Sequence, residues 1–369
     1  MNTVQRAWRI AHDFTSALPR AQLALGASGD WNPLSPRGFR QLGEVIFDEL
    51  ALTGIAASST RGPMLQRTAD SYAAAAEELS GLGVKGAHAD PESLRVKDLR
   101  RRQFGTHEFE ELTFEHRPSV PPSLQAEGFG GRATAVVHLC RIDDSPRPWI
   151  VWVHGAGQGK PFDLLLSRAR RLQDKLGMNI ALPVQPGCGV RRNVWPPYPT
   201  MDPLANVAGV IRAVSEVRAL LRWLRPQSTR NAISGLSMGS PVAALVSHFE
   251  PVDAVAVFTP ILNLNATIGA LTRRWGPALE ETRELLQSDA ASDLATVIDS
   301  LTVAPSAPPH RRLIVGARHD RMAMREPALA LHEQWGGQLY WHDGSHVGHL
   351  FSSGVRKATE QFLRAVVEG

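Results

Sequence analysis

Residues 235–239 read Gly-Leu-Ser-Met-Gly and fit the pattern Gly-x-Ser-x-Gly. A serine hydroxyl is a poor nucleophile unless a base takes its proton, and a sharp turn from a strand into a helix exposes the side chain to both base and substrate. Gly235 and Gly239 leave room for such a turn, because a β-carbon at either position would obstruct it. The motif predicts that Ser237 is a nucleophile, although an ordinary loop can also carry these five residues.

A glycine-rich loop, His154–Gly159, follows a continuous apolar run. Glycines leave backbone N–H groups accessible, and a negative oxygen that develops on a substrate needs such donors. We expect the N–H groups of Ala156 and Met238 to form an oxyanion hole, the latter at the positive end of a helix. Gly155 and Gly157 are expected beside the bound substrate.

A phosphate-binding loop is the alternative interpretation of this glycine-rich segment. Such a loop follows the pattern Gly-x-x-x-x-Gly-Lys-Ser/Thr, and the pair Gly159 and Lys160 matches its centre. His154, however, stands where the first glycine belongs, and Pro161 stands where the hydroxyl belongs. The oxyanion interpretation therefore fits the residues better.

A carboxylate and an imidazole complete this chemistry, and each follows an expected strand. Asp320 comes after the apolar run 313–316, where a carboxylate could hold an imidazole in the correct tautomer. His346 lies in the loop 341–350 ahead of the last expected helix, and we expect it to be the general base. The alternatives are Asp289, Asp293 and Asp343 for the acid and His342 and His349 for the base.

The elements that must position these residues alternate between strand and helix patterns. This alternation predicts an α/β fold with a doubly wound, mostly parallel sheet. Ligands bind beyond the carboxyl ends of the strands in such sheets, which is where the four segments above are expected. The expected strands are 109–114, 132–142, 148–153, 179–182, 231–234, 252–258, 311–316 and 338–341, and the expected helices are 162–176, 205–224, 325–335 and 354–367.

Residues 1–104 are expected to form a helical region outside this sheet. Apolar residues recur at three- and four-residue steps over Trp8–Leu18, Pro36–Leu52 and Met64–Leu82. We interpret the region as an appendage that packs on the core or forms a homodimer contact, and a cover over the active-site mouth is the alternative. Residues 105–369 would then form the catalytic domain.

Two further segments are expected to shape the substrate site. Residues 261–309 lie between two expected strands and carry helical stretches, so we interpret them as a lid that excludes water and selects the substrate. Residues 190–204 form an aromatic and proline-rich loop after a strand end. Trp195 and Tyr198 in this loop are expected to line a hydrophobic site, with core packing as the alternative.

The composition is that of an ordinary globular protein of 369 residues, with 43% hydrophobic and 21% charged residues. The net charge is +4, and basic residues cluster at Arg95–Arg102, Arg168–Arg171 and Arg191–Arg192. These clusters lack the interleaved aromatic residues of a nucleic-acid stacking surface, so no nucleic-acid partner is expected. We interpret them as solvated faces, with contact to an anionic substrate or a membrane surface as the alternative.

Cysteine usage and hydropathy indicate a reducing compartment. Cys140 and Cys188 are far apart and lack a CxxC spacing, so neither a metal site nor a disulfide framework is expected. His12, Asp13 and Arg20 interrupt any apolar run near the start, and no stretch approaches the length of a membrane-spanning helix. We therefore expect a cytoplasmic location.

From about residue 105 to the end, the chain resembles the α/β-hydrolase superfamily. The loop 154–157 resembles its oxyanion loop, residues 235–239 its nucleophile elbow, 316–320 its acid turn and 344–346 its histidine loop. The order Ser, Asp, His along the chain is also that of the superfamily. Within it, Pro186–Arg191 and Ser345–Phe351 are similar to segments of the α/β-hydrolase domain proteins of type 18.

The resemblance implies a cofactor-independent serine hydrolase of the esterase or lipase-like kind. Ser237 would attack a small-molecule or lipid ester, His346 would act as base, Asp320 would orient the imidazole, and water would release the acyl group. Thioester, amide or carbon–carbon cleavage and acyl transfer are alternatives on the same residues. A non-catalytic hydrolase-like scaffold that binds a ligand or a partner protein is the alternative from another class.

Overall fold

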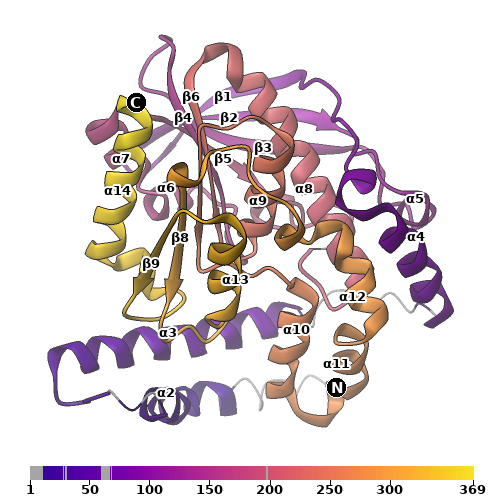
Figure 1. Ribbon diagram of the computed structural model, residues 1–369, viewed down its shortest axis with the longest axis vertical. Helices are drawn as coiled ribbons and strands as arrows, with labels where there is room; N and C mark the ends of the chain where they lie inside the picture. The colour runs from indigo at the N-terminus through magenta and orange to yellow at the C-terminus, as the bar shows by residue number, and fades with distance from the viewer. Residues whose placement is uncertain (1–10, 28, 30, 60–66, 68, 197) are drawn as a thin grey trace.

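A nine-stranded β-sheet runs through the centre of the computed structural model (Figure 1). The structure describes residues 11–369 apart from 28, 30, 60–66, 68 and 197. Trp8 and Met64, where two of the expected helices begin, and Pro197 in the aromatic loop lie outside the described residues. The strands are β1 Val96–Phe104, β2 His107–His116, β3 Ala133–Cys140, β4 Arg147–Val153, β5 Asn179–Val184, β6 Ser228–Leu236, β7 Ala254–Phe258, β8 Arg312–Ala317 and β9 Gln338–His342.

The strands follow the order β1-β2-β3-β5-β4-β6-β7-β8-β9 across the sheet. β1, β2 and β3 pair antiparallel and β3 joins β5 antiparallel, whereas β5, β4, β6, β7, β8 and β9 are parallel. The expected doubly wound, mostly parallel sheet is therefore confirmed. β1 lies within residues 1–104, which were expected to be helical, so that expectation is wrong for Val96–Phe104. The sequence analysis missed this strand because its charged and mostly exposed sequence lacks the apolar alternation of a half-buried strand.

Helices cover both faces of the sheet and its carboxyl edge. They are α2 Ala17–Gly26, α3 Pro36–Ser59, α4 Ala69–Ala87, α5 Pro122–Ala126, α6 Asp163–Leu166, α7 Ala169–Leu176, α8 Pro203–Leu224, α9 Gly239–Phe249, α10 Leu264–Thr272, α11 Glu280–Leu286, α12 Asp289–Ala295, α13 Glu326–Trp335 and α14 Ser353–Glu368. Short 3₁₀ turns add η1 Gly189–Arg191, η2 Arg225–Gln227, η3 Arg273–Leu279, η4 Thr296–Ile298, η5 Ser300–Thr302, η6 Pro309–Arg311 and η7 Gly348–Phe351. None of the described helices is long and apolar enough to cross a membrane.

Two apolar cores lie on opposite faces of the sheet, because successive strand residues point to opposite sides. On β4, Trp149 and Val151 join the core beneath α4, α8, α9 and α13, whereas Ile150 and Trp152 join the core beneath α7 and α14. Burial on both faces explains why the central strands read as continuous apolar runs. The helix expected over 162–176 is divided into α6 and α7, because Arg168 between them adopts a left-handed conformation.

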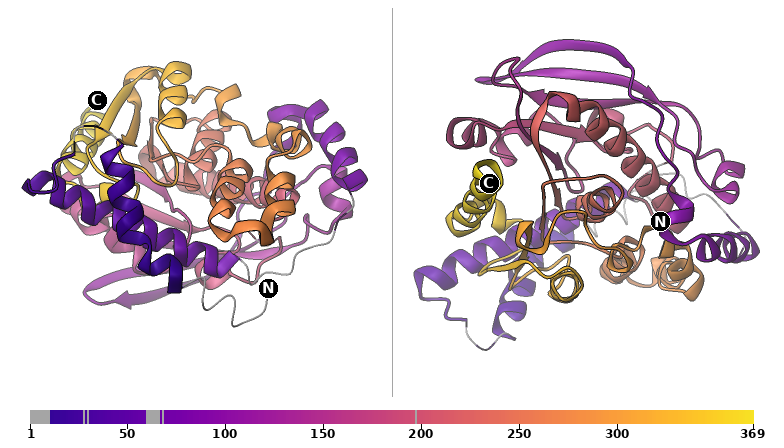
Figure 2. Two further views of the ribbon diagram at one scale, coloured as in Figure 1. Left: turned by 90° about the horizontal axis from the view of Figure 1, so that it is seen from below. Right: turned by 45° about the horizontal axis from the view of Figure 1, so that its top comes forward.

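The N-terminal helix α3 crosses the carboxyl edge of the sheet. Figure 1 shows it below the ends of β8 and β9, and the view from below in Figure 2 shows α2 and α3 together in front of the strand ends. α4 packs separately, against the insertion helix α12 and the turn η4. The N-terminal helices therefore cover part of the edge where a site is expected in this kind of sheet.

Candidate active site

A strained turn joins β6 to α9 at Ser237. The serine has φ +56°, which is uncommon for a residue with a side chain, and its backbone N–H donates to the carbonyl of Phe258 over 2.9 Å. A β-carbon on Gly235 would overlap the carbonyl oxygen of Gly239 and lie 2.6 Å from Ser240 Cα. One on Gly239 would overlap the carbonyl oxygens of β4 and the following loop. The strand, sharp turn and helix expected around Ser237 are therefore present.

Ser237, Asp320 and His346 lie in one hydrogen-bonded row. His346 Nδ1 is 2.8 Å from Asp320 Oδ2, and His346 Nε2 is 2.9 Å from Ser237 Oγ. The other carboxylate oxygen of Asp320 accepts the N–H groups of Met322 and Ala323 at 2.7 and 2.8 Å, which fixes its direction. With the imidazole proton on Nδ1, Nε2 is free to accept the serine proton. The structure thus brings together the three residues predicted as nucleophile, acid and base.

The electrostatics of this row keep His346 basic. Burial alone would lower its pKa, but the adjacent Asp320 carboxylate and the nearby Asp48 carboxylate outweigh burial. The pKa of His346 is therefore raised above its ordinary value. A base with a raised pKa accepts a proton from a hydroxyl more readily, provided that the solution pH leaves it neutral.

The glycine-rich loop lies against the nucleophile. A β-carbon at Gly155 would be 3.1 Å from Ser237 Cβ, and the N–H of Gly155 donates to Gln158 Oε1 over 2.6 Å. The N–H groups of Ala156 and Met238 take no part in the loop and turn hydrogen bonds of the described residues. They are thus available to a negative oxygen beside Ser237, as an oxyanion hole requires. Gly157 has φ +75° and open space around it.

His154 holds this loop in place through hydrogen bonds of its ring. Its Nε2 accepts the N–H of Gln185 over 3.0 Å, and its Nδ1 lies 2.7 Å from the carbonyl oxygen of Gly155. Burial lowers the pKa of His154 to about 4, so the ring is neutral and can accept at one nitrogen while it donates at the other. His154 therefore has a structural role.

A largely apolar pocket opens beside Ser237. The space between its walls measures about 740 Å³ with the mouth included, and helix α10 of the 261–309 insertion supplies one wall. The insertion interpreted as a lid therefore forms part of the pocket wall. The apolar lining side chains are Leu52, Ala156, Pro199, Met201, Met238, Ile261, Leu264, Ile268, Leu271 and Met322.

The aromatic residues expected in this pocket lie elsewhere. Tyr198 is buried in the core, where its ring packs so close to the helix α8 backbone that a β-carbon on Gly209 would overlap it. Trp195 packs on Phe129, with the two ring centroids 5.6 Å apart. Core packing, the alternative for Tyr198, is what the structure has, and Pro199 and Met201 of the same loop line the pocket instead.

The alternative acids and bases have other partners. Asp343 accepts two hydrogen bonds from Arg37, at 2.6 and 2.8 Å, and His342 lies 3.0 Å from a carboxylate oxygen of Glu44. His349 is buried with its Nδ1 on the carbonyl of His346, and burial lowers its pKa to about 3. The remaining two acids, Asp289 and Asp293, belong to helix α12 of the insertion.

Asp48 on α3 is a site residue that the sequence analysis missed. Its carboxylate is fully buried and accepts the N–H of His346 and of Val347, each over 2.9 Å, and the hydroxyl of Ser345 over 2.8 Å. The N–H of Arg321 lies 3.3 Å away. Burial raises the pKa of Asp48 to about 6, so the carboxylate is charged at neutral pH. Asp48 thus holds the histidine loop to the N-terminal helix.

Two neighbouring acids on α3 extend this contact. Glu44 accepts the N–H of Ser345 over 3.1 Å, and Glu49 pairs with Arg274 of the insertion and Arg321 of the acid turn at 2.5 and 3.1 Å. A sequence signal existed, because the buried face of α3 includes Asp48 and Glu49 between apolar residues. Acids on the apolar stripe of a helix are rarely buried without partners.

The predicted basic faces differ from one another in the structure. Arg191 is buried and forms a bidentate ion pair with Glu216, each N···O distance being 2.7 Å. The expectation of a solvated face is therefore wrong at Arg191, because the carboxylate compensates its charge inside the core. The arginines of β1 are mostly exposed, as expected.

Comparison with known proteins identifies relatives in Mycobacterium tuberculosis. "Uncharacterized protein MT2702" of strain CDC 1551 / Oshkosh is 31% identical over 365 residues, which cover 93% of this chain and 86% of the relative. The chain belongs to the family of this mycobacterial protein. "Uncharacterized protein Rv2627c" of strain ATCC 25618 / H37Rv is 33% identical over 283 residues, 74% of this chain and 66% of that protein. No family model matches the chain.

A solved structure shows the same fold. Acetyl xylan esterase 1 from Thermoanaerobacterium sp. JW/SL YS485 superposes with a TM-score of 0.52, over 80% of this chain and 92% of the esterase. The sequence identity is 14%, so the likeness concerns the fold. The α/β-hydrolase fold expected from the motifs is confirmed.

Proposed function

We propose that this protein is a serine hydrolase that cleaves carboxylic esters through an acyl-enzyme intermediate. The observation that carries the proposal is the row from Asp320 through His346 to Ser237, which ends at the mouth of an apolar pocket. The name of the acetyl xylan esterase shows that its fold can serve ester hydrolysis. The narrower resemblance to type 18 proteins is part of this proposal and depends on the segments 186–191 and 345–351.

The proposed reaction begins when Ser237 Oγ attacks the ester carbonyl and His346 Nε2 takes its proton. The N–H groups of Ala156 and Met238 stabilise the negative oxygen of the tetrahedral intermediate. The imidazolium, oriented by Asp320, then protonates the leaving alcohol, and the acyl group stays on the serine. Water attacks this ester in the same way, with His346 again as base, and the acid product leaves.

The apolar pocket favours substrates with an aliphatic or aromatic acyl group. Its walls come from several parts of the chain, including Leu52 from α3, Met201 from the loop before α8 and Leu264 with Ile268 from α10. The described lining includes one cationic side chain, Arg274, and it is engaged by Glu49. Strongly anionic acyl groups are therefore disfavoured.

The first test is Ser237→Ala with a series of p-nitrophenyl esters of increasing acyl length. We expect turnover to fall by about 10⁴-fold or more, because the nucleophile is lost while the pocket remains. Ser80→Ala, at an exposed serine of α4, is the matched control and should keep full activity. A fluorophosphonate adduct on Ser237 in the unaltered protein would support the assignment, and full turnover by Ser237→Ala would refute it.

A further inference from the structure

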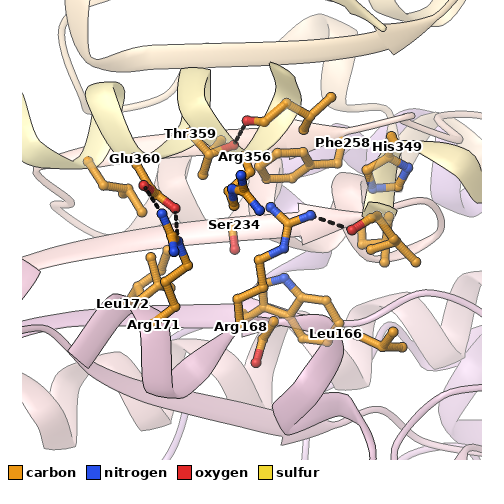
Figure 3. Close-up of a pocket in the computed structure, with 18 residues that line it drawn as sticks. Leu166, Arg168, Arg171, Leu172, Ser234, Phe258, His349, Arg356, Thr359 and Glu360 are labelled. Carbon is orange, nitrogen blue, oxygen red and sulfur yellow. Dashed lines mark hydrogen bonds and ion pairs between the residues drawn. The ribbon is translucent and has the colours of Figure 1, made fainter. Parts of the chain in front are cut away.

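A second pocket lies between α7 and α14, on the face of the sheet that these helices cover (Figure 3). Residues of β4, β6 and β7 form its floor, including Trp152, Leu236 and Phe258. Leu172 of α7 and Leu363 of α14 also line it. The space, which we call the slot, measures about 680 Å³ with the mouth included, and most of its lining side chains are apolar. Its apolar lining suits the alkyl part of a ligand.

Three arginines and one glutamate surround the slot. Arg171 forms a bidentate pair with Glu360, which satisfies both groups. The Arg168 guanidinium donates to the carbonyl of Leu350, and the Arg356 side chain has no hydrogen bond or ion pair among the described residues. One carboxylate therefore faces three guanidiniums, and the region has a local excess of positive charge.

Arg168, which precedes α7, and Arg356 of α14 point toward one another over the slot (Figure 3). Burial, together with the repulsion of Arg356, lowers the pKa of Arg168. An anion between two such guanidiniums would relieve their repulsion and accept hydrogen bonds from both. Arg168 also has φ +56°, a conformation that is costly for an arginine and that directs its side chain from the start of α7.

Ser234, on the floor of the slot, indicates that the ligand also carries a polar group. Ser234 is 1% exposed, and its Oγ has no hydrogen-bond partner within the described part of the chain. It lines the slot on β6 three residues before Ser237, but on the side of the sheet that faces α7 and α14. A buried hydroxyl without a partner is unfavourable unless a water or a ligand satisfies it.

We propose that this slot binds the anion of a single-chain amphiphile, with the alkyl chain against the apolar side chains of the floor and the anionic head in the part of the slot lined by Arg168, Arg356 and Ser234. Fatty carboxylates and single-chain phosphate esters share this chemistry. The proposal does not depend on hydrolysis at Ser237, since the slot lies on the far side of β6 from the core that contains Met238 and α9. It assigns a ligand to one of the basic clusters of the sequence, 168–171.

Calorimetry on the full chain tests the assignment with four probes: decanoate, decyl phosphate, decanol and inorganic phosphate. We expect the two amphiphilic anions, decanoate and decyl phosphate, to bind. Decanol lacks the anionic head and inorganic phosphate lacks the alkyl chain, so each should bind at least about tenfold more weakly. The tighter of the two anions identifies the head group. Equal affinity for decanol, or for inorganic phosphate, would overturn the proposal.

Variants and crosslinking locate the binding. Arg356→Gln should weaken decanoate binding about tenfold, and Arg168→Gln should do so independently, whereas Arg364→Gln on the exposed part of α14 should have no effect. A decanoate with a terminal diazirine should crosslink to peptides of β4, β6, β7, α7 or α14. Crosslinks confined to 261–272 beside the Ser237 pocket, with affinity unchanged in Arg356→Gln, would contradict the proposal.

Discussion

The imidazole of His346 is under the influence of two carboxylates. Asp320 contacts its Nδ1 directly, and Asp48 accepts the backbone N–H of the same residue. Both negative charges favour the protonated ring and raise its pKa. Asp48 is therefore a positioning residue that fixes the loop and also tunes the base, although it does not touch the substrate pocket.

The pH profile of ester hydrolysis should reveal this influence. Since His346 must be neutral to accept the serine proton, kcat/KM should rise with pH through its pKa, which lies above the ordinary value of about 6.5. Asp48→Asn removes a negative charge that raises this pKa, so the acid limb should move to lower pH. The substitution also weakens the contacts that Asp48 makes with the histidine loop, so we expect the loop to shift and kcat to fall by up to about 100-fold.

Glu44→Gln is the control for that experiment, because Glu44 binds the same loop through Ser345 without contributing to the pKa of His346. Its acid limb should stay in place. An unchanged acid limb in Asp48→Asn, or an equal shift in both variants, would show that Asp48 acts on the structure alone.

The glycines of the elbow lead to a prediction of stability. Gly235→Ala places a methyl group against the backbone of α9, so we expect a loss of about 1–3 kcal/mol in the free energy of unfolding, together with loss of activity. Gly81→Ala in α4 is the control, because nothing lies within 4 Å of its β-carbon position. In chemical denaturation, the free energy of unfolding of Gly81→Ala should be unchanged or higher by about 0.5–1 kcal/mol. Similar stability losses for both would contradict the argument.

At the scale of elements, α3 connects three parts of the site that are distant in sequence. Asp48 holds the histidine loop, and Glu49 holds both the acid turn at Arg321 and the insertion at Arg274. The side chain of Glu49 is 1% exposed, so its charge depends on these two partners.

Glu49→Gln should therefore destabilise the protein. It leaves two partly buried guanidiniums without their counter-charge, and we expect a loss of about 2–3 kcal/mol, somewhat below that for a fully buried pair. The exposed pair of Arg364 and Glu368 provides the comparison, since Glu368→Gln should change stability by less than about 0.5 kcal/mol. Thermal and urea unfolding would measure both, and equal effects would argue against a connecting role for α3.

The sequence was informative wherever local pattern decides structure. Apolar runs located the parallel strands, and the positions of glycine, serine, aspartate and histidine after strand ends located the row at Ser237. Asp48 could not be placed in this way, because its partner His346 lies 298 residues away and only the tertiary fold brings them together. Tyr198 was misplaced because an aromatic residue after a strand can equally fill a core, and no local signal distinguishes the two outcomes.

At the scale of the whole molecule, the N-terminal helices and the hydrolase fold share buried contacts. Tyr72 and Leu79 of α4 belong to the same apolar core as the central strands, and Leu52 of α3 lines the pocket beside Ser237. Because these helices contribute to both the core and the site, removing them should impair both folding and activity.

A chain that begins at residue 90 should therefore be inactive or insoluble, even though it contains β1 and all three residues of the row. It lacks the acceptor for the N–H groups of His346 and Val347, which would remain buried and unpaired. A chain that begins at residue 35 retains α3 and α4 and should keep most of its activity. Soluble yield and fluorophosphonate labelling would decide, and a fully active chain from residue 90 would refute this expectation.

The long separation between Asp48 and His346 also has a consequence for biosynthesis. At translation rates of roughly 5–20 residues per second, α3 emerges from the ribosome about 15–60 s before the histidine that it will hold. During that interval its acids lack their final partners, and the emerging nucleophile lacks its base. We therefore expect the nascent protein to stay inactive until synthesis has passed His346, and the proposed esterase activity would report that point.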